Sequence, residues 1–513
     1  MATATLPRKS KKKATYRFKT TPYAHQKAAL RKLISNGFGG GLLMEPRTGK
    51  TKTTIDYMSM LHMKRGVRRF LVVCPTRVMG VWAEELHAHC PYMVQTIIWD
   101  SRTRRKMSTL PDTLGPYDMQ VVVINYEAFA TPGKKLPSGR RSKATGRFKT
   151  RKTLLDWAAL GGGKRNDRNV CMVLDESHKI KSPSGKASTM IVSMQGYFAW
   201  RLILTGTPVT KAKKIADLYM QWKFLNPARL RELGIQTHQD MQDMTGKWIE
   251  KNGYPQFVGT KQFGLQKVHE AIFKDSYAVK RSECFDLPPR ENIREYVRLK
   301  GESARVYDEM AEEMVARLEN GEITEASIAL VLALRLSQIT GGTTKTTDDN
   351  VVRVGREKLD ALKPHLEDAV EREEKLVIAA RFKPDMDAIA SMADRLGLKV
   401  WQIRGGIKRQ ETDEYIREFR KWDDAGVMVV QPQAASLGID LSTASKMIWF
   451  SLTPSYVDFT QCCDRIALSR NSTTFVYLLA EGTVDELLME TLENDHNVAQ
   501  MIITRPELLL RTK

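Results

Sequence analysis

The sequence predicts an α/β protein with two parallel-sheet lobes and a helical segment between them or inserted in them. In two stretches, about 16–225 and 355–495, short apolar runs alternate with helical patterns, as in parallel sheets covered by helices. One apolar run leads into Gly49-Lys50-Thr51, and another leads into Asp175-Glu176. Because ligands bind outside the carboxyl ends of such strands, both motifs also mark a candidate site.

The expected strands are short, continuous apolar runs, which is typical of strands buried on both faces of a sheet. After the Gly-Lys-Thr turn, Ile55, Met58 and Leu61 recur at helical spacing. We expect about five strands in each lobe by this criterion. They span 42–44, 70–74, 121–124, 170–174 and 202–204 in the first lobe, and 376–380, 400–403, 427–431, 447–450 and 475–479 in the second.

The remaining segments differ in composition. Residues 1–15 are rich in Arg and Lys, and we expect a disordered basic arm there. Residues 226–354 show a mainly helical pattern, and an apolar stripe from Tyr307 to Leu318 indicates helix packing. Residues 496–513 are expected to form a C-terminal tail.

A basic insertion is expected at 131–169, within the first lobe. Its first half lacks the apolar residues needed for a core and predicts a mobile loop, whereas 153–160 predicts a short helix. Two interpretations stay open: a loop that contacts phosphates, or a solvated insertion without that role. The phosphate-contacting interpretation rests on Arg140, Arg141, Lys143 and Arg147.

The composition narrows the choice of partners. The chain of 513 residues has a net charge of +22 and a sequence pI near 9.6, which favours nucleic acid as a partner over a membrane. A soluble basic enzyme without such a partner is the alternative. The six cysteines form no Cys-x-x-Cys pair, so neither a zinc site nor a disulfide framework is indicated. With no apolar run of transmembrane length and no secretory signal, we expect no membrane partner and a cytoplasmic, nucleoid-associated location.

The turn at Gly49-Lys50-Thr51 predicts a phosphate-binding loop. Backbone N–H groups at the start of the following helix can hold phosphate oxygens, Lys50 can reach the β and γ phosphates, and the Thr51 hydroxyl can hold Mg²⁺. A nucleotide with β and γ phosphates, together with Mg²⁺, is therefore the expected ligand of this loop, and the family resemblance described next implies that the nucleotide is ATP. The buried run before Asp175 and Glu176 argues against a mere surface pair of acids.

These motifs stand in an order that resembles one family. The chain resembles a superfamily-two helicase or translocase of the DEAD/DEAH-like kind, closest to the Swi/Snf-type DNA-dependent ATPases, as a compact bacterial or phage-like member. The resemblance runs from about Pro22 to Glu486. Besides the two motifs above, it rests on the segments 22–26, 73–85, 125–127, 204–208, 281–289, 434–441, 461–465 and 482–486.

The resemblance implies two RecA-like lobes and a set of roles around ATP. Asp175 would hold Mg²⁺ through water, Glu176 would activate the attacking water, and Gln26 would read adenine. Gln461 and Arg465 would come from the opposite lobe, with Arg465 as an arginine finger. The other implied positions are Gly49, Arg47, Gly438 and Asp440 for nucleotide, and Thr205 and Thr207 for DNA. The segment with Trp82 and Glu85 matches the motif that touches the tracked strand, and Asn125-Tyr126-Glu127 matches Thr-Tyr-Glu.

Two positions depart from the family pattern. Arg47 stands where the family usually has a glycine, which puts the loop geometry in doubt. Leu468 stands where the family has a second arginine, and Arg470 lies two residues further on. If Arg470 does not replace that arginine, transition-state stabilisation depends on Arg465 alone.

The leading hypothesis is an ATP-dependent DNA translocase or helicase, an ATP hydrolase that moves on duplex or forked DNA. Contacts to the phosphate backbone would give it a low sequence preference. One alternative is a nucleotide-gated DNA-binding module with a weakened ATPase, motivated by Arg47 and Leu468. Another is a fork-remodelling or annealing helicase. The oligomeric state stays open, although such motors often work as monomers.

Overall fold

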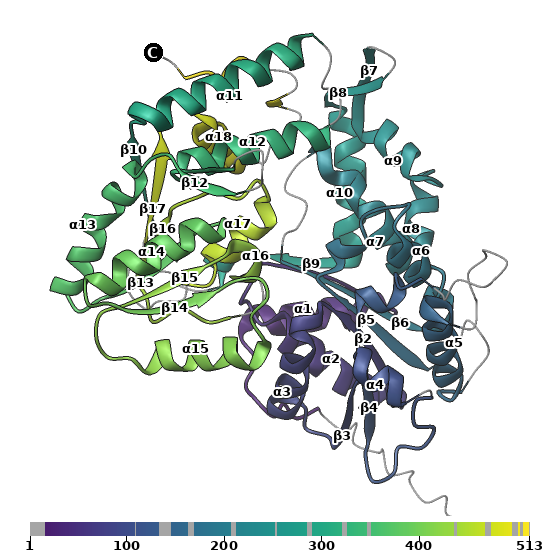
Figure 1. Ribbon diagram of the computed structural model, residues 1–513. Helices are drawn as coiled ribbons and strands as arrows, with labels where there is room; N and C mark the ends of the chain where they lie inside the picture. Colours follow the sequence, from purple (N-terminus) through teal and green to yellow (C-terminus); the bar gives the residue numbers. More distant parts are fainter. Residues whose placement is uncertain are drawn as a thin grey trace, which may run out of the picture. The chain divides into compact units, whose positions relative to one another are not determined.

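A computed structural model of the chain forms two compact units, Met1–Phe285 and Asp286–Lys513 (Figure 1). The residues described are 16–107, 109–132, 145–162, 169–206, 212–251, 254–284, 290–320, 326–345, 350–435, 439–466, 473–494, 501–502 and 506–511. The predicted basic arm at 1–15 lies outside them.

The first unit is built on a parallel sheet of seven strands in the order β3-β4-β2-β5-β6-β1-β9. All neighbouring strands of this sheet pair in parallel, so their carboxyl ends lie along one edge. Its strands are β1 Gly39–Met44, β2 Arg69–Cys74, β3 Val94–Ile98, β4 Met119–Asn125, β5 Val170–Asp175, β6 Trp200–Thr205 and β9 Ser276–Val279.

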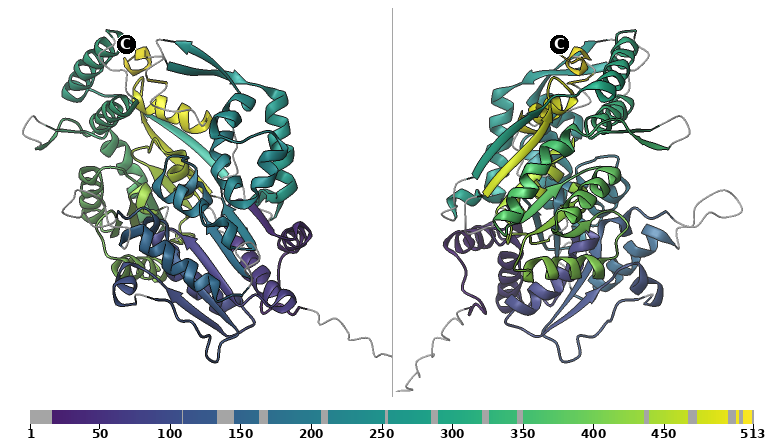
Figure 2. Two further views of the ribbon diagram at one scale, coloured as in Figure 1. Left: turned by 90° about the vertical axis from the view of Figure 1, so that its right-hand side faces the viewer. Right: turned by 60° about the vertical axis from the view of Figure 1, so that its left-hand side comes forward.

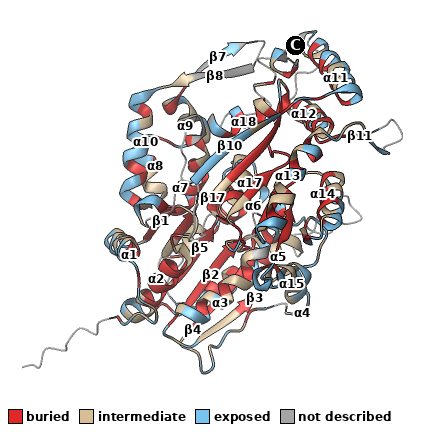
Figure 3. Cartoon of the chain, turned by 90° about the vertical axis from the view of Figure 1, so that its left-hand side faces the viewer, coloured by how far each residue is buried: buried red, intermediate tan, exposed pale blue. Residues whose placement is uncertain are grey.

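Alternate residues of these strands face two separate cores. On β5, Cys171 and Val173 pack with helices α1 to α3, whereas Met172 and Leu174 pack with α5 to α7. Figure 3 shows the central strands as buried. The helices of the unit are α1 Ala24–Asn36, α2 Lys50–Arg65, α3 Met79–His89, α4 Ser101–Lys106, α5 Gly146–Ala159, α6 Lys186–Val192, α7 Tyr219–Leu225, α8 Pro227–Glu232, α9 His238–Thr245 and α10 Gln262–Asp275. An antiparallel hairpin, β7 Gly246–Lys251 and β8 Tyr254–Thr260, lies between α9 and α10 in sequence.

Short 3₁₀ helices extend several of these elements. They are η1 Thr76–Val78, η2 Tyr126–Phe129, η3 Ser177–Ile180, η4 Gln195–Tyr197, η5 Ala212–Leu218 and η6 Arg281–Glu283. Three of them, η1, η2 and η3, directly follow or closely follow the carboxyl ends of β2, β4 and β5. The chain therefore turns sharply at the edge where the predicted site lies.

The second unit has a parallel sheet of six strands in the order β10-β17-β16-β13-β15-β14. Its strands are β10 Arg290–Val297, β13 Lys375–Ala379, β14 Lys399–Ile403, β15 Gly426–Val430, β16 Lys446–Trp449 and β17 Thr473–Ala480. One face packs on α13 Glu357–Glu371 and α14 Lys383–Arg395. The other packs on α11 Gly301–Glu319, α12 Ala326–Thr340, α15 Arg409–Lys421, α17 Tyr456–Cys463 and α18 Val484–Asn494.

Three short elements complete the second unit. The strands β11 Thr343–Lys345 and β12 Val351–Arg353 pair antiparallel and project from the unit in both views of Figure 2. The helix α16 Pro432–Ala435 follows β15, and η7 Pro506–Leu509 packs near the C-terminus. Within the predicted tail, the Leu509 carbonyl accepts a hydrogen bond from Tyr307 Oη at 3.1 Å.

The predicted fold class is confirmed, with differences in detail. Each expected strand is present, but the sheets also contain β3, β9 and β10, which lie at sheet edges. The segment 226–354, predicted as mainly helical, also supplies strands to both sheets, and α11 and α12 belong to the core of the second unit. The predicted helix at 153–160 is part of the longer α5, because Leu154 and Trp157 are buried in the core.

A buried ion pair connects α13 to α18 in the second unit. Lys358 Nζ lies 2.5 Å from Asp485 Oδ2, and the side chains are 1% and 0% exposed. Asp485 also accepts hydrogen bonds from Thr340 Oγ1 and the Ala480 amide. Burial raises the pKa of the neighbouring Asp385 to about 7, and Lys358 opposes this rise. Among the described residues, Lys358 is therefore the buried cation that offsets both carboxylates.

We expect Lys358→Met to destabilise the second unit by about 3–5 kcal/mol, because it leaves the buried Asp485 carboxylate without its charge partner. Hydrogen exchange of the β13 and β17 amides measures this loss in the second unit alone. The control is Lys363→Met on the same helix, which breaks an exposed pair with Glu367 and should cost no more than about 1 kcal/mol. Equal losses in the two variants would contradict the prediction.

Candidate active site

The loop 45–49 connects the buried strand β1 to α2 and contains two left-handed residues. Gly49 has φ 81° and ψ 37°, and Arg47 has φ 64°. A Cβ atom on Gly49 would lie 2.1 Å from Gln26 Nε2, so only glycine fits there without displacement. The left-handed turn leads directly into the N-terminus of α2, where the first backbone N–H groups of a helix can bind an anion.

The start of α1 packs against this loop. Gln26 is 2% exposed, its Nε2 donates to the Thr48 carbonyl at 3.3 Å, and its Oε1 accepts from the Tyr23 amide at 3.0 Å. His25 Nε2 lies 2.8 Å from the same Thr48 carbonyl oxygen. The structure therefore brings Gln26 to the phosphate-binding loop, and it adds His25, which the sequence reasoning did not single out.

Lys50 lies across the end of β1. Its Nζ donates to the carbonyl oxygens of Met44 at 2.8 Å and Glu45 at 3.2 Å. A Cβ atom on Gly206 would lie 3.4 Å from the same Nζ, so the end of β6 adjoins the ammonium group. Thr51 follows in the first turn of α2.

The two predicted carboxylates lie at the end of β5, which neighbours β6 in the sheet. Burial and, less strongly, the charge of Glu176 together raise the pKa of Asp175 to about 6, and the Trp82 hydrogen bond and the charge of Lys50 oppose this rise. Glu176 has φ 54°, and its Oε2 lies 3.3 Å from His178 Nδ1. The ends of β1, β5 and β6 thus gather Lys50, Asp175 and Glu176 at one edge.

Two buried side chains hold Asp175. Trp82 Nε1 on α3 donates to Asp175 Oδ2 at 2.9 Å, and Tyr126 Oη on η2 donates to the Asp175 carbonyl at 2.8 Å. Burial raises the pKa of Tyr126 well above its usual value, so the phenol keeps the proton that it donates. Both residues lie in segments that match family motifs, but the sequence gives no sign that they meet Asp175.

The loop is also tied to the chain beyond β9. Glu45 Oε2 accepts from the Arg281 amide at 2.8 Å, and the Glu45 amide donates to the Val279 carbonyl at 3.2 Å. Arg281 itself is 7% exposed. The segment matched by sequence to the family's linker therefore begins in direct contact with the phosphate-binding loop.

The donor atoms at this edge fit ATP with Mg²⁺. A carboxylate from Asp175 and a hydroxyl from Thr51 are hard oxygen ligands, and Mg²⁺ typically takes one or two protein oxygens together with phosphates and water. The left-handed turn before α2 provides N–H groups for an anion, and Lys50 provides a positive charge. The residues present thus suit a magnesium-bound triphosphate.

In the first unit, the predicted DNA contacts divide into two groups. Arg147 lies at the start of α5, where its guanidinium stacks 5.0 Å from the Phe148 ring centroid. Beside it, a cavity of about 300 Å³ is lined by Arg104, Arg105 and Lys149 together with hydroxyl groups. Thr205 is 2% exposed at the end of β6, so its side chain suits a link between sites better than a direct DNA contact.

In the second unit, two predicted motifs meet. The Leu441 amide donates to the Arg465 carbonyl at 3.1 Å, which brings the segment containing Asp440 beside the turn after α17. Gln461 lies on α17 and is partly exposed, as is Arg465. Asp440 accepts from the Ser442 amide at 3.1 Å. Seven discussed residues lie outside the described part of the chain: Arg140, Arg141, Lys143, Thr207, Gly438, Leu468 and Arg470.

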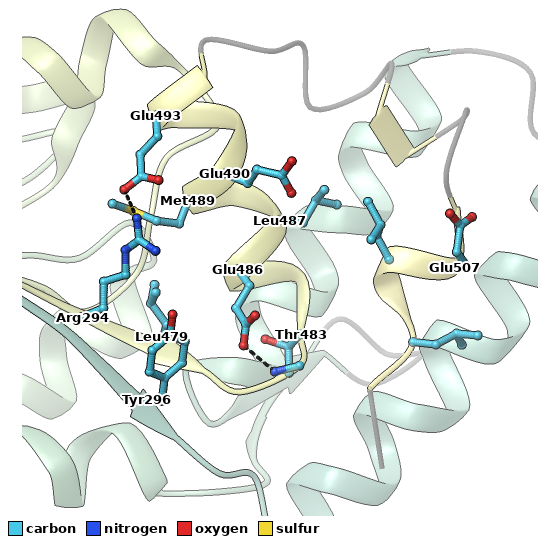
Figure 4. A pocket seen from close by; sticks show the side chains of 13 residues that line it. Arg294, Tyr296, Leu479, Thr483, Glu486, Leu487, Met489, Glu490, Glu493 and Glu507 are labelled. Carbon is cyan, nitrogen blue, oxygen red and sulfur yellow. Dashed lines mark hydrogen bonds and ion pairs between the residues drawn. The ribbon is translucent and has the colours of Figure 1, made fainter.

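A cavity of the second unit has the wrong charge for binding phosphate groups. It has about 340 Å³ and lies between β10, α18 and η7. Figure 4 shows Glu486, Glu490, Glu493 and Glu507 around it, with Arg294 paired to Glu493. This acidic rim would repel phosphates, and none of the predicted site residues lines the cavity.

The chain matches two known domain families. The SNF2-related domain matches residues 25–340, and the helicase conserved C-terminal domain matches residues 357–468. The chain belongs to the SNF2-related family. This confirms the resemblance seen in the sequence, and the first match includes every first-unit residue placed above at the strand ends.

Individual SNF2-related proteins are distant from this chain. The ISWI chromatin-remodeling complex ATPase CHR17 of Arabidopsis thaliana is 23% identical and covers 82% of this chain and 36% of the relative. YwqA of Bacillus subtilis (strain 168), named as a candidate ATP-dependent helicase/translocase, is 22% identical and covers 95% and 49%. The chain thus spans between a third and a half of the curated relatives that it matches.

A solved structure from the family is also similar. The SWI2/SNF2 ATPase core of Sulfolobus solfataricus, in complex with dsDNA, is 20% identical and covers 96% of this chain and 95% of that chain, with a TM-score of 0.41.

Within the described residues of the present chain, no helix is both long and apolar enough to cross a membrane.

We expect substitution to cost more stability at Gly49 than at Arg47, the two left-handed positions. Gly49→Ala should destabilise the first unit by about 1–3 kcal/mol, because the new Cβ atom meets Gln26 in a left-handed backbone. Arg47→Gly should change stability by less than about 1 kcal/mol, since relief of the left-handed strain offsets the added chain entropy. Thermal unfolding of both variants checks this, and a larger loss for Arg47→Gly would refute it.

Proposed function

We propose that the protein is an ATP-dependent DNA translocase that couples ATP hydrolysis to movement along duplex or forked DNA. The observation that carries this is the gathering of Lys50, Asp175 and Glu176 at one sheet edge, in a chain with both SNF2-related and helicase C-terminal regions. Phosphoryl transfer depends mainly on positioning and charge neutralisation, and this edge supplies both.

Each residue at the edge has a role in this proposal. Lys50 neutralises the β and γ phosphates, and Thr51 and Asp175 hold Mg²⁺, which would polarise the phosphoryl oxygens when bound. Glu176 orients and deprotonates the attacking water. Gln26 contacts adenine from the loop side, with Arg47 and Gly49 shaping the phosphate site.

The second unit contributes the remaining groups. Gln461 and Arg465 would supply the groups that act on the phosphates from the second unit, with Arg465 as an arginine finger and Arg470 as its partner. Gly438 and Asp440 complete the nucleotide-binding set. The bond between the Leu441 amide and the Arg465 carbonyl supports joint movement of these two motifs.

DNA is the proposed partner of this basic protein. The net charge of +22 and the basic cavity beside Arg147 favour contacts with phosphates, which carry little sequence preference. Thr205 and Thr207 would link the ATP site to the bound strand. A cytoplasmic, nucleoid-associated location and function as a monomer accord with such a motor.

A nucleotide-gated DNA-binding module is the second candidate. The specific observation in its favour is the left-handed backbone of Arg47, a residue with a side chain where the family pattern has glycine. This candidate would bind ATP and DNA but hydrolyse slowly. Measurement of the ATPase rate with single-stranded, duplex and forked DNA separates the translocase from the module, because strong stimulation by DNA excludes the module. A separate assay with a labelled fork tests the third function: displacement of the labelled strand indicates a fork-remodelling helicase.

We expect Lys50→Ala and Glu176→Gln each to lower the DNA-stimulated ATPase rate by at least about 100-fold, because they remove the phosphate ligand and the general base. A coupled assay of phosphate release with and without duplex DNA measures this. The control is Lys64→Ala, an exposed lysine near the end of α2, which should retain the full rate. Undiminished hydrolysis by Glu176→Gln would count against the assignment.

We expect the joint replacement of Arg140, Arg141, Lys143 and Arg147 by Ala to weaken DNA binding and to flatten its salt dependence. Each lost phosphate contact should reduce the slope of log K against log salt by about 0.9. Fluorescence anisotropy with a labelled duplex at several salt concentrations measures the slope. A charge-matched control replaces exposed basic residues of the second unit, Arg305, Lys363, Lys399 and Lys421. An unchanged slope would favour the solvated insertion.

A further inference from the structure

Trp82 lies in a segment that the family resemblance relates to DNA, but its indole is fully buried at 0% exposure. It extends from α3 to the end of β5, where Nε1 donates to Asp175 Oδ2 at 2.9 Å. The indole packs within the same core as α1, α2 and α3. A direct contact between this side chain and DNA is therefore excluded by burial.

The chemistry of the indole suits the orientation of a carboxylate. Its single N–H is a donor only, and the ring is fixed by the core around it. A bond from this neutral donor fixes one oxygen of Asp175 and leaves its negative charge in place. A lysine or arginine at the same position would instead cancel that charge. The full charge of Asp175 then remains available to a cation at the other oxygen.

Tyr126 acts on the backbone of the same residue. Its hydroxyl, 2.8 Å from the Asp175 carbonyl oxygen, holds the peptide that joins Asp175 to Glu176. Glu176 has φ 54°, a left-handed conformation that non-glycine residues rarely adopt. Because the bonded carbonyl belongs to the peptide before Glu176, the phenol helps to keep that conformation and so the direction of the Glu176 side chain.

The two segments that carry Trp82 and Tyr126 are bonded to each other. Thr76 Oγ1, shortly before α3, donates to Glu127 Oε2 at 3.1 Å and accepts from Asn125 Nδ2 at 2.9 Å. Asn125 and Glu127 are the immediate neighbours of Tyr126 in sequence. The donors on either side of β5 therefore belong to one hydrogen-bonded frame.

We propose that Trp82 and Tyr126 are positioning residues for ATP hydrolysis: Trp82 orients the Asp175 carboxylate toward Mg²⁺, and Tyr126 holds the Asp175–Glu176 peptide so that Glu176 faces the attacking water. The inference rests on the proposed function and assigns neither residue a contact with ATP. It separates the two roles, since Trp82 acts on the metal ligand and Tyr126 acts on the general base.

The test compares Trp82→Phe with Tyr126→Phe, each of which removes one donor and keeps an aromatic ring. Trp82→Phe should raise the Mg²⁺ concentration for half-maximal hydrolysis about 10-fold and lower kcat. Tyr126→Phe should lower kcat about 10-fold with an unchanged Mg²⁺ requirement. Nucleotide affinity measured in EDTA with a fluorescent ATP analogue should stay within about twofold of the parent in both, because neither donor binds nucleotide.

A second readout does not depend on turnover. The ratio of analogue affinities with and without Mg²⁺ should fall in Trp82→Phe and stay at the parent value in Tyr126→Phe. If the parent protein hydrolyses no ATP, the proposed function fails, and this ratio still decides the role of Trp82. If Trp82→Phe does not fold, the kcat of Tyr126→Phe decides the proposal.

The matched control is Trp157→Phe. Trp157 is another buried indole of the same unit, and its Nε1 donates to the Gln120 side chain at 2.5 Å, not to a carboxylate. It should leave kcat and the Mg²⁺ requirement unchanged. Parent-like kinetics in Trp82→Phe, or equal effects of Trp82→Phe and Trp157→Phe, would overturn the proposal.

Discussion

The main physical constraint on the first unit lies at Asp175, whose carboxylate must be kept charged at the buried end of a central strand. Burial and the adjacent Glu176 oppose ionisation, while Lys50 and the Trp82 donor favour it. The parallel register of β1, β6 and β5 brings these opposing groups to one edge. The local turns after β1, β2, β4 and β5 then serve to hold the groups around that charge.

The central strands and the edge strand β14 could be predicted from the sequence, whereas the edge strands β3, β9 and β10 could not. Strands buried on both faces, such as β2 and β5, are continuous apolar runs and stand out in the sequence. By contrast, β10 is largely exposed, β3 is half-buried, and β9 has four residues. Their place in the sheets depends on pairing with distant strands, which no local pattern records.

The candidate site also combines residues that the sequence reveals with contacts that it does not reveal. The motif residues Lys50, Asp175 and Glu176 are detectable because their chemistry requires particular side chains at fixed spacing after a strand. The contacts from His25 to Thr48 and from Trp82 to Asp175 span 23 and 93 residues and have no such signature. The motif position of Thr205 predicts a role in DNA binding, and its burial at 2% exposure is a further feature that the motif does not record.

The bond from the Arg281 amide to Glu45 gives the phosphate-binding loop a mechanical attachment. Arg281 begins η6, only a few residues before the first unit ends at Phe285. The point where the chain leaves the first unit and the predicted phosphate-binding loop are therefore joined by a direct hydrogen bond. A displacement of the Arg281 backbone would consequently reach the loop through one side chain, that of Glu45.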